Sequence, residues 1–340
     1  GLAVTGWKPC VEIQFGDYIW TAMMQIRNEV ASMRYRSNGK WKCPLIMRVP
    51  VGGYIHGAIC HSQSIDGYFI HMPGVRIAYP SNAADAKGLL KAACRMDDPV
   101  LFMEHKGLYR QGFAATPEPD ENYILPFGQA RVVQEGSVAT IITWGAMVQK
   151  SIEAVKAAGI DHGLVEIVDL RTLNPLDYSA IETSISKTGK VLVVYEDMLT
   201  NGPGAEIAAI IADRHFESLD GPIKRVGAAD AHVPYNWFLE EKVLPQTSDI
   251  QKALTELSRI LQNEDISKPV SITVSSGQIV FKMDSFLLIS RVIEGQFPDY
   301  KQVIPKESQN RFLVKRQTFL SAADRASIIA AGSNNVVRFM

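Results

Sequence analysis

The sequence has few cysteines and no long apolar run. Its four cysteines, Cys10, Cys43, Cys60 and Cys94, are far apart and form no C-x-x-C pair. This argues against a disulfide framework or a zinc site and favours a reducing cytosol. No apolar run reaches the ~18 residues of a membrane span, and residues 1–30 lack a basic-then-apolar signal pattern. We therefore expect a cytoplasmic protein with no membrane partner.

Charge is balanced over the whole chain but not along it. The 340 residues carry a net charge of −1, which gives no general attraction to nucleic acid. Residues 1–258 hold 24 Lys and Arg against 29 Asp and Glu, whereas residues 259–340 hold 11 against 7. Every His, Cys and Trp lies before residue 259. These coincident changes predict that the two segments have different origins, and the length suggests two or three domains.

Residues 1–115 alternate short apolar runs with helical patterns. We expect strands at 9–15, 44–49, 75–79 and 100–104, and helices at 17–38 and 82–95. The first helix should bury one face, formed by Ile19, Met23, Ile26, Val30 and Met33. Ser81 or Asn82 should cap the second helix. Strand–helix alternation predicts a parallel sheet covered by helices.

A second α/β series follows residues 107–127, which contain several Pro and acidic residues and read as a linker. We expect strands at 139–144, 165–169 and 191–195, and helices at 146–158, 178–187, 202–215 and 250–257. This segment is long enough for its own sheet and core. It therefore reads as a second α/β domain.

The tail has a different character. Ile272, Val274, Ile279 and Phe281 alternate around Ser-Ser-Gly, which predicts a β-hairpin with one buried face. Further elements are expected as a short helix at 287–295, a turn at 297–300, a strand at 311–316 and a helix at 318–331. The tail thus reads as an antiparallel α+β unit.

Several motifs of the front segment are specific. EIQFGDYIW, HGAICHSQS, DAKGLL and DLRTLNPLD succeed one another along residues 1–258. Together they resemble the beta chain of branched-chain 2-oxo acid dehydrogenase, with pyruvate dehydrogenase beta chains as close relatives. The resemblance implies two transketolase-like domains with parallel sheets. Residues 1–115 would be a thiamine-diphosphate pyrimidine-binding domain that lacks its first part, and residues 116–258 a transketolase C-terminal-like domain.

The resemblance also implies a chemistry. Thiamine diphosphate, with Mg²⁺, supplies the electron sink for oxidative decarboxylation of a 2-oxo acid, and the acyl group passes to a lipoyl arm. The implied partners are an alpha chain, in an α2β2 assembly that shares the cofactor, and the lipoyl domain of the acyltransferase core. The preferred 2-oxo acid is left open.

Three residues match the family's site, and a fourth is a further candidate. His61 matches an active-site histidine that shuttles a proton during acyl transfer; a core or capping histidine is the alternative. Gln14 and Tyr18 match residues beside the aminopyrimidine ring, although Tyr18 could simply pack. His56 is a further cofactor-side candidate or an ordinary loop histidine. Cys60 adjoins His61, but neighbours in a chain rarely face each other, so no Cys–His dyad is expected.

The resemblance implies a buried monovalent cation such as K⁺, held largely by backbone carbonyls. The matching positions are Leu45, Ile46, Ala93, Met96 and Asp98. Met96 stands where the family usually has Asp, so a carbonyl ligand would survive there and a carboxylate ligand would not. A helix C-terminus nearby favours a cation.

The family's essential glutamate belongs to a T-P-x-x-E motif that this sequence does not contain. By resemblance it would lie upstream of Gly1. We therefore expect the chain as given to be inactive in decarboxylation, even with an alpha chain.

The tail resembles a second family. LISRVIEGQFPDYKQVIP and the residues around it are similar to the bacterial sliding clamp, the DNA polymerase III beta subunit. Residues 259–340 would span the end of one clamp domain and the start of the next, with Pro298 and Val303 at peptide-groove positions. Such a fragment cannot close a ring, so we do not expect it to bind DNA.

Three interpretations therefore compete. The chain is a 2-oxo acid dehydrogenase beta subunit with an unrelated tail, a binding module that recruits replication proteins through the tail, or a chimeric or misassembled chain. Glu196 and Asp197 follow a strand and could be a site pair, but a structural role is favoured for them.

Overall fold

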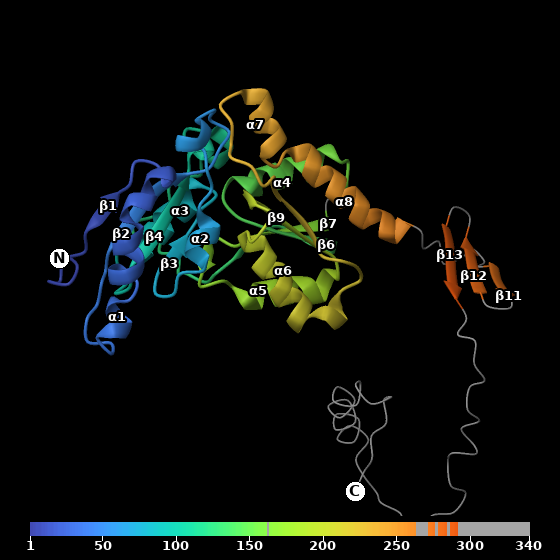
Figure 1. The fold of residues 1–340 in the computed structure, drawn as a ribbon, viewed down its shortest axis with the longest axis horizontal. Helices are drawn as coiled ribbons and strands as arrows, with labels where there is room; N and C mark the ends of the chain where they lie inside the picture. Colours follow the sequence, from blue (N-terminus) through green and yellow to red (C-terminus); the bar gives the residue numbers. More distant parts are fainter. Residues whose placement is uncertain (162, 263–270, 276–277, 284–285, 292–340) are drawn as a thin grey trace, which may run out of the picture. The chain divides into compact units, whose positions relative to one another are not determined.

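The computed structural model describes residues 1–161 and 163–262, and in the tail the segments 271–275, 278–283 and 286–291. The chain divides into two units, Gly1–Glu264 and Asp265–Met340 (Figure 1). In the described part of the chain, no helix is both long and apolar enough to cross a bilayer.

The first sheet of the front unit has five strands in the order β1-β2-β4-β3-β8. Their bounds are β1 Cys10–Glu12, β2 Ile46–Val51, β3 Arg76–Ala78, β4 Val100–His105 and β8 Thr172–Asn174. The first four are parallel, as predicted, while β8 pairs antiparallel with β3. Because β8 lies more than 90 residues beyond β3 in the sequence, a strand pattern alone could not have placed it there.

The segment predicted as one helix at 17–38 is helical but broken. It consists of a 3₁₀ helix Gly16–Ala22, a π-helix Gln25–Val30 and α1 Met33–Arg36. The predicted apolar face is nevertheless right, since Ile19 and Ile26 are buried and the other three residues are half-buried. The local hydrogen bonding therefore changes along the segment while the same side faces the core.

The remaining helices of the first half are α2 Asp66–Ile70 and α3 Ala83–Ala93. Asn82 caps α3, because its side-chain oxygen accepts a hydrogen bond from the Asp85 amide at 3.0 Å. Three short 3₁₀ turns lie at Ala58–Cys60, Lys106–Leu108 and Gly112–Ala114. The last two fall at the start of the segment expected as a linker.

The second sheet has the order β10-β9-β6-β7-β5. Its strands are β5 Arg131–Gln134, β6 Gly136–Thr143, β7 Gly163–Asp169, β9 Val191–Met198 and β10 Lys224–Ala228. All neighbours are parallel except β5 and β7. The edge strands β5 and β10 were not predicted, because they are short and carry fewer apolar residues than the central strands.

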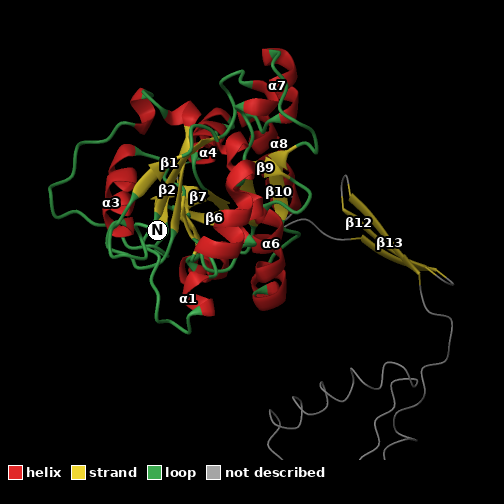
Figure 2. Cartoon of the chain, turned by 60° about the vertical axis from the view of Figure 1, so that its left-hand side comes forward, coloured by secondary structure: helices red, strands yellow, loops and turns green. Residues whose placement is uncertain are grey.

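Helices surround the two sheets of the front unit (Figure 2). Those of the second half are α4 Ala146–Ala157, α5 Tyr178–Thr188, α6 Pro203–Arg214, α7 Trp237–Val243 and α8 Thr247–Gln262. Four of them were expected, and α7 was missed. Ile250, Leu254 and Leu257 of α8 are buried against the second sheet, so this helix belongs to the front unit through residue 257.

One hydrophobic cluster joins the two sheets. It includes Val49 and Met103 of the first sheet, Val168 of the second, and Trp144 and Tyr195, whose rings stack at 5.7 Å. All five are almost fully buried. The two α/β halves therefore share a core, and the predicted domain boundary at 115/116 stays a prediction.

The tail contains a three-stranded sheet, β11 Ser271–Ser275, β12 Gln278–Met283 and β13 Phe286–Arg291. The predicted hairpin is confirmed, with Ile272 opposite Phe281 and Val274 opposite Ile279. The helix expected at 287–295 is wrong over its first part, where β13 pairs antiparallel with β12. A short aliphatic run fits either structure, and here the unpaired edge of β12 provides partners for its backbone groups.

Candidate functional site

The loops that follow the parallel strands of the first sheet carry the predicted site residues. β1 ends at Glu12 and leads into residues 13–18, and β2 ends at Val51 and leads into residues 52–64. We call residues 52–64 the His61 loop. Open α/β sheets bind ligands outside the carboxyl ends of their strands. The fold therefore brings these segments, far apart in sequence, to one sheet edge.

His61 is half-buried at the end of the 3₁₀ turn Ala58–Cys60. Its Nε2 lies 2.9 Å from the Tyr18 hydroxyl, and its Nδ1 lies 3.1 Å from the Gly57 carbonyl oxygen. Because a carbonyl can only accept, Nδ1 carries a proton and donates it to Gly57. In the neutral ring Nε2 then accepts from Tyr18. Nε2 is thus the nitrogen that can take up a proton.

Phe15 holds this pair from the side. Its ring meets that of His61 edge-on, with centroids 4.4 Å apart, and meets that of Tyr18 edge-on at 5.5 Å. Tyr18 remains 41% exposed, and Gln14 on the same segment is also exposed. The structure thus brings Tyr18 and His61 into contact and leaves Gln14 at the surface beside them. Their roles stay predictions.

Glu196, at the end of β9, anchors both ends of the His61 loop. One carboxylate oxygen accepts from the Gly53 amide at 2.6 Å and from the Ser64 hydroxyl at 3.3 Å. The other accepts from His105 Nε2 at 2.5 Å. Burial alone would raise the pKa of Glu196, but His105, its hydrogen bond and the Gly53 amide together hold that pKa below the ordinary value. The carboxylate is therefore ionised and fully bonded at neutral pH.

His105 is fixed as firmly as its partner. Its Nδ1 accepts from the Gly107 amide at 3.0 Å, so the proton is on Nε2 and is donated to Glu196. The loop turns directly onto this ring at Gly52, where φ is +86°. A Cβ at Gly52 would lie 2.2 Å from His105 Nε2. Only glycine allows the loop to approach His105 this closely.

Glu240 of α7 holds the middle of the loop. This carboxylate is buried and accepts from the Tyr54 amide at 3.0 Å and the His56 amide at 3.3 Å. It also contacts His56 Nδ1. The predicted site residue His56 is thus bound through its ring to an acid of the second half, while its side chain is 55% exposed. Its cofactor-side role stays a prediction.

A buried carboxyl pair lies beyond the loop, at the start of α2. Asp197 accepts from the Gly67 and Met198 amides at 2.9 and 2.8 Å. Asp66 accepts from the Trp144 indole at 2.9 Å. Burial, and then the negative charge of Asp197, raise the pKa of Asp66 well above its usual range. Asp66 therefore keeps its proton to a higher pH than an ordinary aspartate, and burial raises the pKa of Asp197 as well.

An acid and a base near Phe15, Asp17 and Lys106, have buried polar atoms without a hydrogen-bond partner among the described residues. These atoms are both carboxylate oxygens of Asp17 and the Nζ atom of Lys106. Burial raises the pKa of Asp17, against the opposing effect of Lys106. Burial lowers the pKa of Lys106 to about 8, against the opposing effects of Asp17 and Glu196. The charges of Asp17 and Lys106 thus influence each other's pKa without a direct hydrogen bond between them.

The predicted cation ligands near β2 have backbone partners. The Leu45 carbonyl accepts from the Val100 amide at 2.8 Å, and Ile46 lies within the ladders of β2. At the end of α3, the Ala93 carbonyl accepts from the Met96 amide at 3.1 Å. Each of these oxygens keeps a second lone pair.

Two of the predicted cation ligands, the Met96 carbonyl and the Asp98 carboxylate, already contact basic side chains of the protein. The Met96 carbonyl accepts from Lys8 Nζ at 2.8 Å. The Asp98 carboxylate pairs with Arg34 Nε at 2.5 Å and with an Arg76 nitrogen at 3.5 Å. In the described residues, no group of three or more His, Cys, Asp or Glu side chains could hold a metal ion. The monovalent cation stays a prediction.

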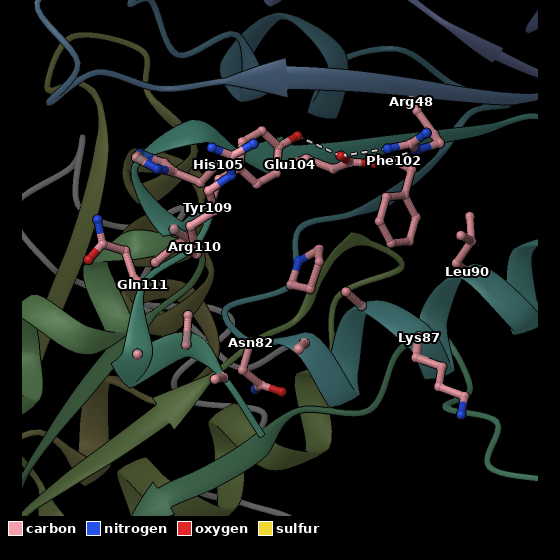
Figure 3. A pocket seen from close by; sticks show the side chains of 17 residues that line it. Arg48, Asn82, Lys87, Leu90, Phe102, Glu104, His105, Tyr109, Arg110 and Gln111 are labelled. Carbon is pink, nitrogen blue, oxygen red and sulfur yellow. Dashed lines mark hydrogen bonds and ion pairs between the residues drawn. The ribbon is translucent and has the colours of Figure 1, made fainter. Parts of the chain in front are cut away.

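A largely apolar cavity of about 620 Å³ lies over the first sheet, beside α3 (Figure 3). Phe102 and Leu90 face it, and at its rim Arg48 pairs with Glu104 through two hydrogen bonds of 2.6 and 2.9 Å. The Tyr109 hydroxyl also donates to Glu104, at 2.6 Å. These charges satisfy one another, so the cavity presents mainly hydrocarbon.

Sequence reasoning missed most of the groups that hold the site. Glu196 was noted only as part of an acidic pair after a strand, and that position was its one available signal. Lys106, Asp17 and Glu240 gave no signal, because each acts on residues distant in the sequence. Pro298 and Val303 lie outside the described residues.

Comparisons with known proteins match the front segment and the tail to different families. Residues 1–111 match the family described as transketolase, pyrimidine binding domain, and residues 128–250 match transketolase, C-terminal domain. Residues 245–299 match DNA polymerase III beta subunit, central domain. The resemblances predicted for both segments are thereby confirmed.

Two curated relatives come from Bacillus subtilis. The 2-oxoisovalerate dehydrogenase subunit beta is 44% identical over 259 residues, which are 76% of this chain and 79% of that protein. The pyruvate dehydrogenase E1 component subunit beta is 40% identical over 250 residues, 74% of this chain and 76% of that protein. Among solved structures, a split gene transketolase described as an inactive beta4 tetramer is 22% identical. Its TM-score is 0.61, with 76% of this chain and 78% of that chain covered. This likeness confirms the transketolase-like fold.

Proposed function

The chain belongs to the family of 2-oxo acid dehydrogenase beta subunits, and from this premise we propose that it serves in the oxidative decarboxylation of a 2-oxo acid. The finer parts of the proposal are a branched-chain substrate, acyl transfer to a lipoyl group, a partner alpha chain and a cytoplasmic location. The names of the relatives, a 2-oxoisovalerate dehydrogenase subunit beta and a pyruvate dehydrogenase subunit beta, support the branched-chain substrate and the partner alpha chain. The observation that carries the mechanism is the His61–Tyr18 contact.

The donor set suits thiamine diphosphate at the edge of the first sheet. Gln14 offers an amide that can both donate and accept, as an aminopyrimidine requires, and the exposed face of Tyr18 offers an aromatic surface. When bound, this cofactor supplies the electron sink for decarboxylation. Mg²⁺ would belong to its diphosphate, and the alpha chain would complete that part of the site.

His61 Nε2 is the proton-transfer atom in this proposal. With Nδ1 fixed by Gly57, Nε2 would deliver a proton to the lipoyl sulfur that is released when the lipoyl S–S bond breaks and the acyl group bonds to the other sulfur. The Tyr18 hydroxyl holds the ring in line for this exchange. Such a group contributes on the order of 10²–10⁴-fold to a rate.

The test assays 2-oxoisovalerate turnover with the alpha subunit of the Bacillus subtilis relative. Two forms of the full chain would be compared: the chain as given, and the chain preceded by the relative's own N-terminal segment with its T-P-x-x-E motif. Activity with an artificial electron acceptor is expected only in the second form. Equal activity of the two forms would overturn the expectation of inactivity made from the sequence.

In the active form, His61→Ala should slow acyl transfer to lipoyl by about 10²-fold or more and slow decarboxylation less. His232→Ala, which removes an exposed histidine, is the matched control. If His61→Ala and His232→Ala behave alike, His61 is not the proton-transfer group.

A second proposal concerns the tail. Because residues 245–299 match a clamp domain while residues 1–111 and 128–250 match transketolase domains, we propose that the chain joins fragments of two genes. The match begins at residue 245, inside a segment whose side chains pack in the front unit through residue 257. Sequencing genomic DNA across residues 250–265 tests this. One uninterrupted reading frame there would support a natural fusion instead.

A further inference from the structure

Lys106 is a buried ammonium that needs an explanation. It follows β4 directly, is 9% exposed, and its Nζ makes no hydrogen bond to any residue that the structure describes. A buried charge is normally paired or hydrogen-bonded, because desolvation is otherwise too costly. Longer-range electrostatic attraction, rather than a single ion pair, must therefore stabilise this buried ammonium.

Two carboxylates and one aromatic ring act on this ammonium. Asp17 and Glu196 are the two acids that favour its charged form, and neither is within ion-pair distance in the described residues. The ammonium lies 5.6 Å from the centroid of the Phe15 ring, which is suitable for a cation–π contact. Lys106 is thus attracted to two acids at once and rests on an aromatic face.

Both acids belong to structures that fix His61. Asp17 lies between Phe15, whose ring contacts His61, and Tyr18, whose hydroxyl bonds to His61. Glu196 bonds to the Gly53 amide and the Ser64 hydroxyl at the two ends of the His61 loop. One ammonium therefore interacts electrostatically with both supports of the same imidazole.

We propose that Lys106 is a positioning residue, whose charge compensates Asp17 and Glu196 together and so holds the Phe15–Tyr18 segment and the His61 loop against each other. The importance of this geometry for catalysis rests on the proposed function of His61. The geometry itself is a property of the chain alone. Nothing in the sequence indicated it, because the three charged residues are separated by about 90 positions each.

The arrangement implies a dependence on pH. The pKa of Lys106 is lowered to about 8, chiefly by burial. Below that pH the ammonium balances the two acids; above it the amine is neutral and the acids are left uncompensated. The other charged or titratable groups nearby are His105, the last residue of β4, and four residues that line a cavity of about 510 Å³ with Lys106, namely Tyr54, Tyr109, Lys150 and Glu153.

His105 donates through Nε2 to Glu196 and accepts at Nδ1 from the Gly107 amide, so both of its ring nitrogens are bonded. Burial raises the pKa of Tyr54 far above this range and lowers that of Lys150 from its ordinary value. Lys150 rests on the Tyr54 ring at 4.1 Å and contacts Gln246 at 3.4 Å. Glu196 also favours the charged form of Lys150, so a titration of Lys150 would be reported by these two residues and through Glu196 by Gly53, whereas the Phe15 amide reports on Lys106.

The experiment follows the backbone amides of Gly53 and Phe15 by NMR in the full chain between pH 6 and 10. In the unaltered chain both amides should shift in one step with a midpoint of about 8. In Lys106→Arg, which keeps its charge, they should stay at the low-pH position throughout. In Lys106→Met, which never carries charge, they should stay near the high-pH position.

Lys42→Met is the matched control, because Lys42 forms an exposed ion pair with Asp97 at 2.7 Å. It should titrate like the unaltered chain. The proposal is overturned if the step of the Phe15 amide near pH 8 persists in either Lys106 variant, or if the unaltered chain shows no step there. The unaltered chain alone decides the matter should Lys106→Met not fold. Because no cofactor or alpha chain is present, failure here is distinct from failure of the proposed function.

Discussion

Glu196 should be among the most sensitive positions of the front unit. Replacing Glu196 by Ala removes the acceptor of two buried donors, the Gly53 amide and His105 Nε2–H, which donate to no other acceptor among the described residues. An orphaned buried donor costs about 1–3 kcal/mol. Because the Ser64 hydroxyl is only half-buried and can turn to water, it adds little. We expect a loss of about 4 kcal/mol in the free energy of unfolding.

Glu196→Gln separates the acceptor role from the charge. The amide oxygen can still accept from Gly53, but the amide NH2 then meets the Nε2–H of His105. The imidazole cannot escape by changing tautomer, since Nδ1 must remain an acceptor for the Gly107 amide. One buried donor is left unpaired, so the loss should be about 1–3 kcal/mol.

Urea unfolding followed by tryptophan fluorescence measures these losses. All five tryptophans lie before residue 259, so the signal reports on the front unit. Glu135→Ala is the control, because Glu135 is 78% exposed and pairs with Lys187 at the surface; about 0–1 kcal/mol is expected there. The reasoning is refuted if Glu196→Ala costs no more than the control, or if Gln is as damaging as Ala.

Three further predictions concern other parts of the chain. The pKa of Asp66 is raised in the folded state, so the folded state holds this proton to higher pH than the unfolded state, and the contribution of Asp66 to stability falls as pH rises above about 4. The free energy of unfolding in urea, measured between pH 4 and 7, should therefore depend less on pH in Asp66→Asn. An unchanged pH dependence in this variant would contradict the prediction. Limited proteolysis should cut first within about residues 255–270, where the two units meet in sequence; a resistant fragment of full length would be evidence against it. Calorimetry with thiamine diphosphate and Mg²⁺ should detect little binding to the chain alone and clear binding with an alpha chain, whereas micromolar affinity of the chain alone would show that no shared site is needed.

Local patterns in the sequence determined several elements correctly. The alternation of apolar runs and helical faces located β2, β4, β6, β7 and β9, because central parallel strands are apolar on both faces. Asn82 was predictable as a cap, since its side chain needs only the amide three residues on. The hairpin at β11 and β12 followed from period-two alternation around Ser-Ser-Gly. In each case the cause and the effect lie within a few residues.

The tertiary structure decided what depends on distant partners. The segment at 16–36 is broken into three kinds of helix, although its apolar spacing indicated one helix. β8 joins the first sheet only because β3 offers an unpaired edge. β13 is a strand rather than a helix because β12 provides a ladder for it.

The candidate site divides in the same way. The motif around His61 marked the residue, but its usable nitrogen was fixed only by the Gly57 carbonyl and the Tyr18 hydroxyl. Sequence could not show that Glu196 would hold the loop, because its acceptor atoms meet Gly53 from 143 positions away. Residue types thus specified which chemistry was available, and long-range packing specified where each proton and charge is held.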